Sequence, residues 1–165
     1  MKHPIIAAAL MLGATAATAQ EMYVGVGAAH FDDDELGITS VALTYDYKPT
    51  PNFAMQVALA TSGDDDVASP IGPINVELDY ALSAKAKLGV PAGNAFLYGM
   101  VGYSNYNLDA SARGFTFSQD GNGSLLGAGV DFNMAGPWGI GLEYARGFND
   151  LEDTNIFQAV VRYGF

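Results

Sequence analysis

The sequence predicts an all-β chain that forms an eight-stranded antiparallel transmembrane β-barrel. Three observations support this prediction. Half of the residues are hydrophobic, yet no apolar run after residue 19 approaches the roughly 18 residues that indicate a helical membrane span. Apolar residues instead alternate with small or polar residues, with the period of two that is typical of β-strands. Short and longer connections also alternate between these segments, as at the two ends of a membrane barrel.

The first 19 residues have the layout of a secretory signal peptide. Lys2 and His3 precede a compact apolar run over residues 5–12, and small residues then lead to Ala19, after which cleavage is expected. The apolar run is shorter than the about 20 residues that a helix needs to span a bilayer. An uncleaved anchor or a buried helix is the alternative. We therefore expect residues 1–19 to be the signal peptide of an exported protein and residues 20–165 to be the barrel domain.

Eight segments carry the alternation, and the longest and strictest covers 17 residues without a break. The predicted strands are 22–31, 39–47, 53–62, 74–90, 95–107, 125–134, 138–148 and 156–165. The predicted short turns are 48–52, 91–94 and 135–137, and the longer acidic loops are 32–37, 63–73, 108–124 and 149–155. An even number of strands places both termini on the side of the short turns, which is the periplasmic side of such barrels.

The two faces of the predicted strands differ, and the difference indicates which one faces lipid. One face is apolar, whereas the other is rich in Gly, Ala and Ser, which suits the narrow interior of an eight-stranded barrel. Aromatic residues gather near the strand ends on the apolar face, as in interfacial girdles: Tyr45, Tyr47, Phe53, Phe132, Trp138, Tyr163 and Phe165. A secreted soluble β-protein is the alternative to a barrel in lipid.

Charged residues also occur in mid-strand on the small-residue face. The predicted lumen set is Asp46, Glu77, Asp79, Lys85, Lys87, Asp131, Glu143 and Arg162. Because unpaired charges in a narrow lumen are costly, we expect a hydrogen-bonded network of ion pairs that fills the barrel. A selective path for ions is the alternative.

The C-terminal residues 156–165 resemble the assembly signal of outer-membrane proteins. Phe165 is terminal, Tyr163 is the aromatic residue two before it, and Phe157 and Val161 are apolar residues at alternate positions further back. Residues 23–27 and 127–132 also resemble the OmpA-like family of small outer-membrane barrels. The resemblance implies a bacterial outer-membrane location, contact with outer-membrane lipid and lipopolysaccharide, and recognition by the barrel-assembly machinery. It does not imply one activity, since members include structural anchors, adhesins, small or occluded pores and a few lipid-A enzymes.

Composition excludes several other classes of function. The chain has no cysteine, which excludes zinc–thiolate sites and cysteine nucleophiles. Residues 20–165 contain eighteen acids and six bases, a net charge of −12 that argues against binding of nucleic acid. We expect no cofactor.

Twelve acids fall in the predicted long loops, among them the runs 32–34 and 64–66. Carboxylate oxygens are ligands for calcium and magnesium, so we predict a weak divalent-cation site at Asp32, Asp33, Asp34, Asp64, Asp65 and Asp66. The EF-hand spacing is absent, and solvated loops are the alternative.

His30 lies near the start of the first acidic loop, but no matching His-x-Ser motif accompanies it, so no catalytic residue is predicted. The sequence therefore favours a non-enzymatic outer-membrane barrel with an envelope structural or surface-interaction role. A small pore for ions or small solutes is the second reading, and a lipid-A-modifying enzyme is the third.

Overall fold

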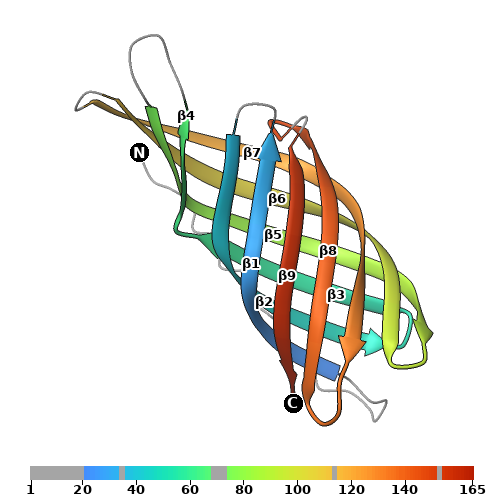
Figure 1. Cartoon of the computed structure of the whole chain (residues 1–165). Helices are drawn as coiled ribbons and strands as arrows, with labels where there is room; N and C mark the ends of the chain where they lie inside the picture. The colour runs from blue at the N-terminus through green and yellow to red at the C-terminus, as the bar shows by residue number, and fades with distance from the viewer. Residues whose placement is uncertain (1–20, 34–35, 68–73, 113–114, 152–153) are drawn as a thin grey trace, which may run out of the picture.

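The computed structural model describes residues 21–33, 36–67, 74–112, 115–151 and 154–165 (Figure 1). These residues form the strands β1 (Glu21–Asp33), β2 (Leu36–Thr50), β3 (Phe53–Thr61), β4 (Gly63–Val67), β5 (Ile74–Ala92), β6 (Ala95–Ala112), β7 (Phe115–Asn133), β8 (Trp138–Asn149) and β9 (Asn155–Gly164). Within this part of the chain, no helix is long and apolar enough to cross a membrane. The predicted signal peptide, residues 1–19, lies outside the described residues.

The strands form one closed antiparallel sheet. Except for β3 and β4, strands that follow one another in the chain pair with each other; β1 also pairs with β9, and β3 pairs with β5 to complete the ring. β3 and β4 are two parts of one strand that pairs with β5 along its length and is interrupted at Ser62. The predicted fold class, an eight-stranded antiparallel barrel, is therefore confirmed within the described residues.

Burial alternates along the strands as the sequence pattern predicts. In β9, Gln158, Val160 and Arg162 are buried, whereas Phe157 and Val161 are exposed. The outer surface carries many large apolar side chains of this kind, from every side of the barrel. Such an apolar band is the surface that a membrane barrel presents to lipid, and the closure of the sheet allows the backbone groups of the wall to be paired.

The strands differ in length, which gives the barrel one tall side. β5, β6 and β7 have 19, 18 and 19 residues, whereas β8 and β9 have 12 and 10. Figure 1 shows β6 and β7 extending well beyond the ends of β8 and β9. The prediction that residues 108–124 form a loop is wrong, because β6 and β7 continue through most of that range as a paired hairpin. Gly-rich and polar residues hid this continuation, since they weaken the apolar alternation on which the prediction depended.

The third strand also continues beyond its predicted end. Residues 63–67, predicted as part of a loop, form β4 and pair with β5. Ser62 separates β4 from β3 and has a φ of 64°. The Thr61 hydroxyl donates a hydrogen bond to the Asp79 carbonyl of the neighbouring strand at 2.7 Å. Both strands are therefore irregular at the same height in the wall.

In β5 this irregularity is a β-bulge that reverses the two faces of the strand. Opposite β6, the pairing shifts between Tyr80 and Leu78, so that Asp79 is an additional residue in β5. Because side chains alternate with a period of two, one additional residue sends every following side chain to the opposite face. Leu78 is consequently buried at 3% exposure, whereas Glu77 and Asp79 are exposed. The prediction that Glu77 and Asp79 point into the lumen is wrong for this reason.

Candidate functional site

A network of buried ion pairs crosses the lumen in the half of the barrel toward the short turns. Among the described residues it contains three acids and three bases, and their exposure ranges from 0% for Lys87 to 7% for Lys85 and Glu143. The ion pairs are Lys85 Nζ–Glu143 Oε2 at 2.6 Å, Lys87 Nζ–Asp46 Oδ1 at 2.8 Å, Lys87 Nζ–Glu143 Oε1, and Arg162 Nη1–Asp131 Oδ2 at 2.8 Å. The structure thus brings together six of the eight predicted lumen residues, without Glu77 and Asp79, and their formal charges balance.

Neutral side chains join these ion pairs across the barrel. The Gln56 amide on β3 donates to Asp46 Oδ1 and to Glu143 Oε1, both at 3.1 Å. The Tyr98 hydroxyl on β6 donates to Glu143 Oε1 at 2.9 Å, and Gln158 Oε1 on β9 accepts from Lys85 Nζ at 3.1 Å. Glu143 on β8 is therefore the centre of contacts from β3, β5 and β6. We refer to the six ions with these three neutral residues as the lumen network.

The three neutral members of the network are not among the residues predicted from the sequence. Gln56 and Gln158 lie on the predicted inner faces of their strands, so a polar side chain at that position was the available signal. Tyr98 gave no such signal, because the two faces of residues 95–107 look alike in sequence. Gly129 lies directly opposite Tyr98, and a Cβ there would lie 2.6 Å from the Tyr98 hydroxyl. Glycine at position 129 of β7 therefore leaves the space that the Tyr98 side chain of β6 occupies.

The lumen network occupies the interior of the barrel with buried, paired side chains. Its ions are desolvated, so each depends on its partners, and removing one partner of a buried pair typically costs about 3–5 kcal/mol. An ion that crossed the barrel would have to separate these pairs in a space that is already filled by side chains. The arrangement therefore suits a structural core better than a continuous path.

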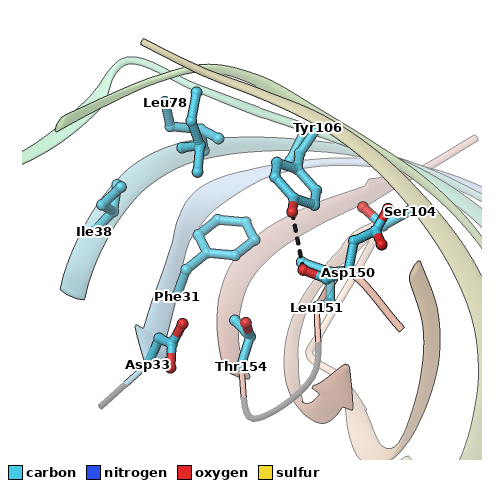
Figure 2. Close-up of a pocket in the computed structure, with 11 residues that line it drawn as sticks. Phe31, Asp33, Ile38, Leu78, Ser104, Tyr106, Asp150, Leu151 and Thr154 are labelled. Atoms are coloured by element: carbon cyan, nitrogen blue, oxygen red, sulfur yellow. Dashed lines mark hydrogen bonds between the residues drawn. The ribbon is translucent and has the colours of Figure 1, made fainter. Parts of the chain in front are cut away.

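A second inward-facing region lies at the end of the barrel opposite the short turns, which we call the outer end. It forms a cavity of about 100 Å³. We call it the mouth pocket, and Figure 2 shows its lining residues on β1, β2, β5, β6 and the β8–β9 connection. They are Phe31, Asp33, Ile38, Leu78, Ala81, Ser104, Tyr106, Leu108, Asp150, Leu151 and Thr154. Most of this lining is apolar, in contrast to the lumen network below it. The sequence pattern did not indicate this pocket, because the apolar faces of the strands were expected to point outward.

The β8–β9 connection supplies the inner wall of the mouth pocket. Leu151 is 7% exposed, and the amide of Thr154 donates to its carbonyl at 3.0 Å. The Tyr106 hydroxyl of β6 donates to the Asp150 carbonyl at 2.9 Å, which ties the connection to the tall side of the barrel. A Cβ at Gly147 would lie 2.5 Å from the Leu151 Cβ. Glycine at that position therefore provides the space that Leu151 occupies.

The predicted cation ligands are dispersed along strands. Asp32 and Asp33 lie at the end of β1, Asp34 lies outside the described residues, and Asp64, Asp65 and Asp66 form part of β4. Strand alternation separates the side chain of Asp65 from its two neighbours, and Asp65 Oδ2 accepts the Gly37 amide at 2.8 Å. In the described part of the chain, no three His, Cys, Asp or Glu residues lie close enough together to hold a metal ion.

The outer surface holds the remaining residues singled out in the sequence. Phe157, Val161 and Tyr163 project outward from β9, and the terminal Phe165 is 65% exposed. Tyr163 contacts Trp138 edge to face, with ring centroids 5.1 Å apart. The Nδ1 atom of His30 lies 2.9 Å from the Thr39 hydroxyl, at hydrogen-bond distance.

Comparisons with known proteins agree with this architecture. The chain matches the outer membrane protein β-barrel domain over residues 5–165, and a search of curated protein sequences gives no significant match. It is similar to the structure of Ail, the attachment invasion locus protein of Yersinia pestis, in complex with the heparin analogue sucrose octasulfate. The two chains are 17% identical, the match covers 88% of this chain and 97% of that chain, and the TM-score is 0.58. The N-terminal β-barrel domain of Pseudomonas aeruginosa OprF gives 12% identity, 88% and 97% coverage and a TM-score of 0.60. E. coli outer membrane protein W gives 16% identity, 89% and 98% coverage and a TM-score of 0.58.

At these identities the solved structures support the fold alone, whereas the family match spans nearly the whole sequence. Together with the closed barrel and its apolar outer band, this match shows that the chain belongs to the outer membrane protein β-barrel domain family.

Proposed function

We propose that this protein is a closed, non-enzymatic outer-membrane barrel with an envelope structural or surface-interaction role. The observation that carries the proposal is the lumen network, in which buried ion pairs connect β8 to β5 and hydrogen bonds from Gln56 and Tyr98 connect β8 to β3 and β6 across the interior. A network of this kind stabilises the wall from inside and leaves the outer face as the part of the protein available for recognition.

The test is conductance of the purified protein in planar bilayers. Wild type is expected to give no steady conductance, because ions would have to break the buried pairs. The double variant Lys87→Ala with Glu143→Ala removes two central members of the network and is expected to give measurable current. The matched control, Asp64→Asn with Asp79→Asn, changes two exposed outer residues and is expected to stay closed. A steady conductance in wild type would replace this proposal with a small pore.

The distribution of charge supports a role at the outer face. Among the described residues, ten acids lie toward the outer ends of the strands: Asp32, Asp33, Asp64, Asp65, Asp66, Glu77, Asp79, Asp109, Asp120 and Asp150. In the same part of the structure, the base is Arg146 on β8. An acidic outer face attracts cations and repels polyanions.

This charge suggests a difference from the Ail complex with sucrose octasulfate. We propose that the present barrel does not bind sulfated polyanions, although it shares the fold. Retention on immobilised heparin at physiological salt measures this directly, with little or no retention expected. Strong, salt-sensitive retention would contradict the charge argument.

We also propose that residues 1–19 are cleaved on export and that β9 carries the signal read by the barrel-assembly machinery. Phe157, Val161, Tyr163 and Phe165 face outward, where another protein can contact them before the barrel closes. Changing Tyr163 and Phe165 together to Asp is expected to lower the yield of inserted protein, measured as heat-modifiable barrel in membrane fractions. Normal insertion of this variant would show that the C-terminal aromatics are not needed for recognition.

A further inference from the structure

We propose that a hollow in the outer wall of the barrel holds one acyl chain of an outer-leaflet lipid, with the ester group of that chain beside His30. The hollow lies on β1, β9 and β8, which pair in this order and stand side by side in Figure 1. The inference goes beyond the proposed function, because it concerns the lipid-facing side of the wall and holds whether or not the lumen conducts.

Two small side chains at paired positions form the floor of the hollow. Ala28 on β1 lies directly opposite Ala159 on β9, and both point outward between inward-facing neighbours. Phe157 and Leu142, which are large and exposed, line the hollow with them. Its open volume is about 340 Å³, more than twice the about 150 Å³ of an engineered protein cavity that takes up benzene. The hollow is therefore large enough for a segment of hydrocarbon chain.

A pair of aromatic residues marks the depth of the hollow in the membrane. Tyr144 on β8 contacts Phe157 on β9, with ring centroids 5.0 Å apart, and both lie nearer to the outer end than Ala159 does. The Tyr144 hydroxyl donates to Asn155 Oδ1 at 2.8 Å. A tyrosine with its ring toward lipid and its hydroxyl on a polar group is typical of the membrane interface. The hollow therefore begins just below the outer interface, where ester groups join acyl chains to head groups.

His30 places a polar group at the outer edge of this hollow. Glu143 and Gln158 also belong to the lining, but their side chains bond to Lys85 in the lumen, so their backbone borders the hollow. His30 lies opposite Phe157 in the strand pairing, and its Nδ1 atom lies 2.9 Å from the Thr39 hydroxyl, which holds the ring in place. The second ring nitrogen, Nε2, can form one hydrogen bond with a lipid oxygen.

The neighbouring charge favours an ester over a phosphate at this position. Asp32 is the next outward-facing residue of β1 after His30 and lies closer to the outer end. Its carboxylate would repel a phosphate beside His30, whereas an ester carbonyl is uncharged and accepts an N–H hydrogen bond. The hollow and His30 therefore match the chain and the ester of one lipid, in the order in which they follow one another along the molecule.

The test compares two phosphatidylcholines that differ only in how their chains are linked, one through esters and one through ethers. The barrel is released from nanodiscs of either lipid in native mass spectrometry, and the apparent affinity for one retained lipid is measured. We expect one ester lipid to stay bound. The ether lipid is expected to bind about fivefold more weakly, which corresponds to the roughly 1 kcal/mol of one hydrogen bond.

A second measurement locates the retained chain. In nanodiscs of the ester lipid, nuclear Overhauser effects are recorded between lipid methylene protons and alanine methyl groups. We expect them to be stronger at Ala28 and Ala159 than at Ala84, an outward-facing alanine of β5 that serves as the reference for mobile lipid.

Variants separate the hollow from the hydrogen bond. Ala159→Leu fills the hollow and is expected to abolish retention of both lipids, whereas the matched control Ala84→Leu adds the same side chain elsewhere on the outer wall and is expected to change nothing. His30→Ala keeps the hollow, so both lipids are expected to bind equally, at the affinity of the ether lipid.

Retention that survives Ala159→Leu, or equal contacts at all three alanines, would overturn the proposal, since the wall would then contact only mobile lipid. Equal affinity of wild type for the two lipids would overturn the placement of an ester at His30. Dimers of the barrel that disappear in Ala159→Leu would also overturn it, because the hollow would then be an interface between two copies.

Discussion

The lumen network and the mouth pocket lie in the same barrel but have opposite polarity. In the network, polar side chains such as Lys87 and Glu143 face inward, while apolar residues of the same strands face outward. At the mouth, Leu78 is buried inside and its neighbours Glu77 and Asp79 are exposed. The interior of this barrel is therefore not polar or apolar as a whole. At each level of the barrel, the interior is polar where lipid surrounds the wall and apolar where water surrounds it.

The reason is the change of solvent along the strands. Where the wall is in lipid, apolar side chains are best placed outside and polar groups pair within. Above the lipid, water surrounds the wall and the apolar side chains are best placed inside, as in a soluble protein. The apolar alternation of β5 continues through this boundary without a change of phase in sequence. The bulge at Asp79 turns the apolar side chains of β5 from the outer face to the inner face at the level where water replaces lipid around the wall.

The comparison predicts that the largest loss of stability follows from breaking the lumen network. Glu143→Ala leaves Lys85 without its ion-pair partner and removes one of two partners from Lys87. We expect the free energy of unfolding to fall by about 3–5 kcal/mol, because a buried charge is left uncompensated. Urea unfolding of the refolded barrel in lipid vesicles measures this change.

A rim ion pair provides the control for this variant. Glu21 pairs with Lys48 at 3.4 Å at the turn end of the barrel, where the Glu21 side chain is 43% exposed. Glu21→Ala is expected to cost about 1 kcal/mol or less, the range of exposed pairs. Equal costs for the two variants would show that burial does not set the strength of the lumen network.

Leu151→Ala is expected to have the next largest effect. The substitution removes a buried apolar side chain, for which losses of about 2–5 kcal/mol are typical. We expect a value near the lower limit, about 2 kcal/mol, since water at the outer end can occupy the space. The same unfolding assay measures it, with conductance recorded in parallel. If current appeared, the β8–β9 connection and not the lumen network would be the seal.

Tyr106→Phe is a milder change in the same region. It removes the hydrogen bond to the Asp150 carbonyl and keeps the ring, so the expected loss is about 1 kcal/mol. Amide hydrogen exchange of the β8–β9 connection is expected to accelerate, while exchange in β2 and β3 stays unchanged. A uniform acceleration across the barrel would instead indicate that this hydrogen bond supports the whole fold.

The smallest effect is expected from Glu77→Gln with Asp79→Asn. Both side chains are exposed, and exposed substitutions typically change stability by about 0.5 kcal/mol or less. This pair tests the comparison directly, because placement in the lumen would make the loss resemble that of Glu143→Ala. A loss of several kcal/mol would show that the bulge does not turn these residues outward.

The fold and most of the lumen network could be predicted from sequence because both depend on local periodicity. Asp46, Lys85, Lys87, Asp131, Glu143 and Arg162 each interrupt a small-residue face, and the phase of the strand alone places them inside. Glu77 and Asp79 follow the same phase, but a bulge is determined by pairing with neighbouring strands and leaves little trace in one segment. The mouth pocket combines five elements, and Leu151 enters it from a connection without periodicity.

Because the strands differ in length, the barrel is taller on one side than on the other and is not symmetric about the membrane normal. β6 is eight residues longer than β9, a difference of roughly 25 Å along the strand at the usual rise of about 3.3 Å per residue. The outer rim of the barrel is therefore slanted: it is higher at β5, β6 and β7 than at β8 and β9 (Figure 1). Among the described residues, a solute that approaches from the side of β8 and β9 meets shorter strands than one that approaches from the side of β5, β6 and β7. Rotation of the barrel about the membrane normal, which changes nothing for a symmetric cylinder, here changes the direction in which the side with the shorter strands faces.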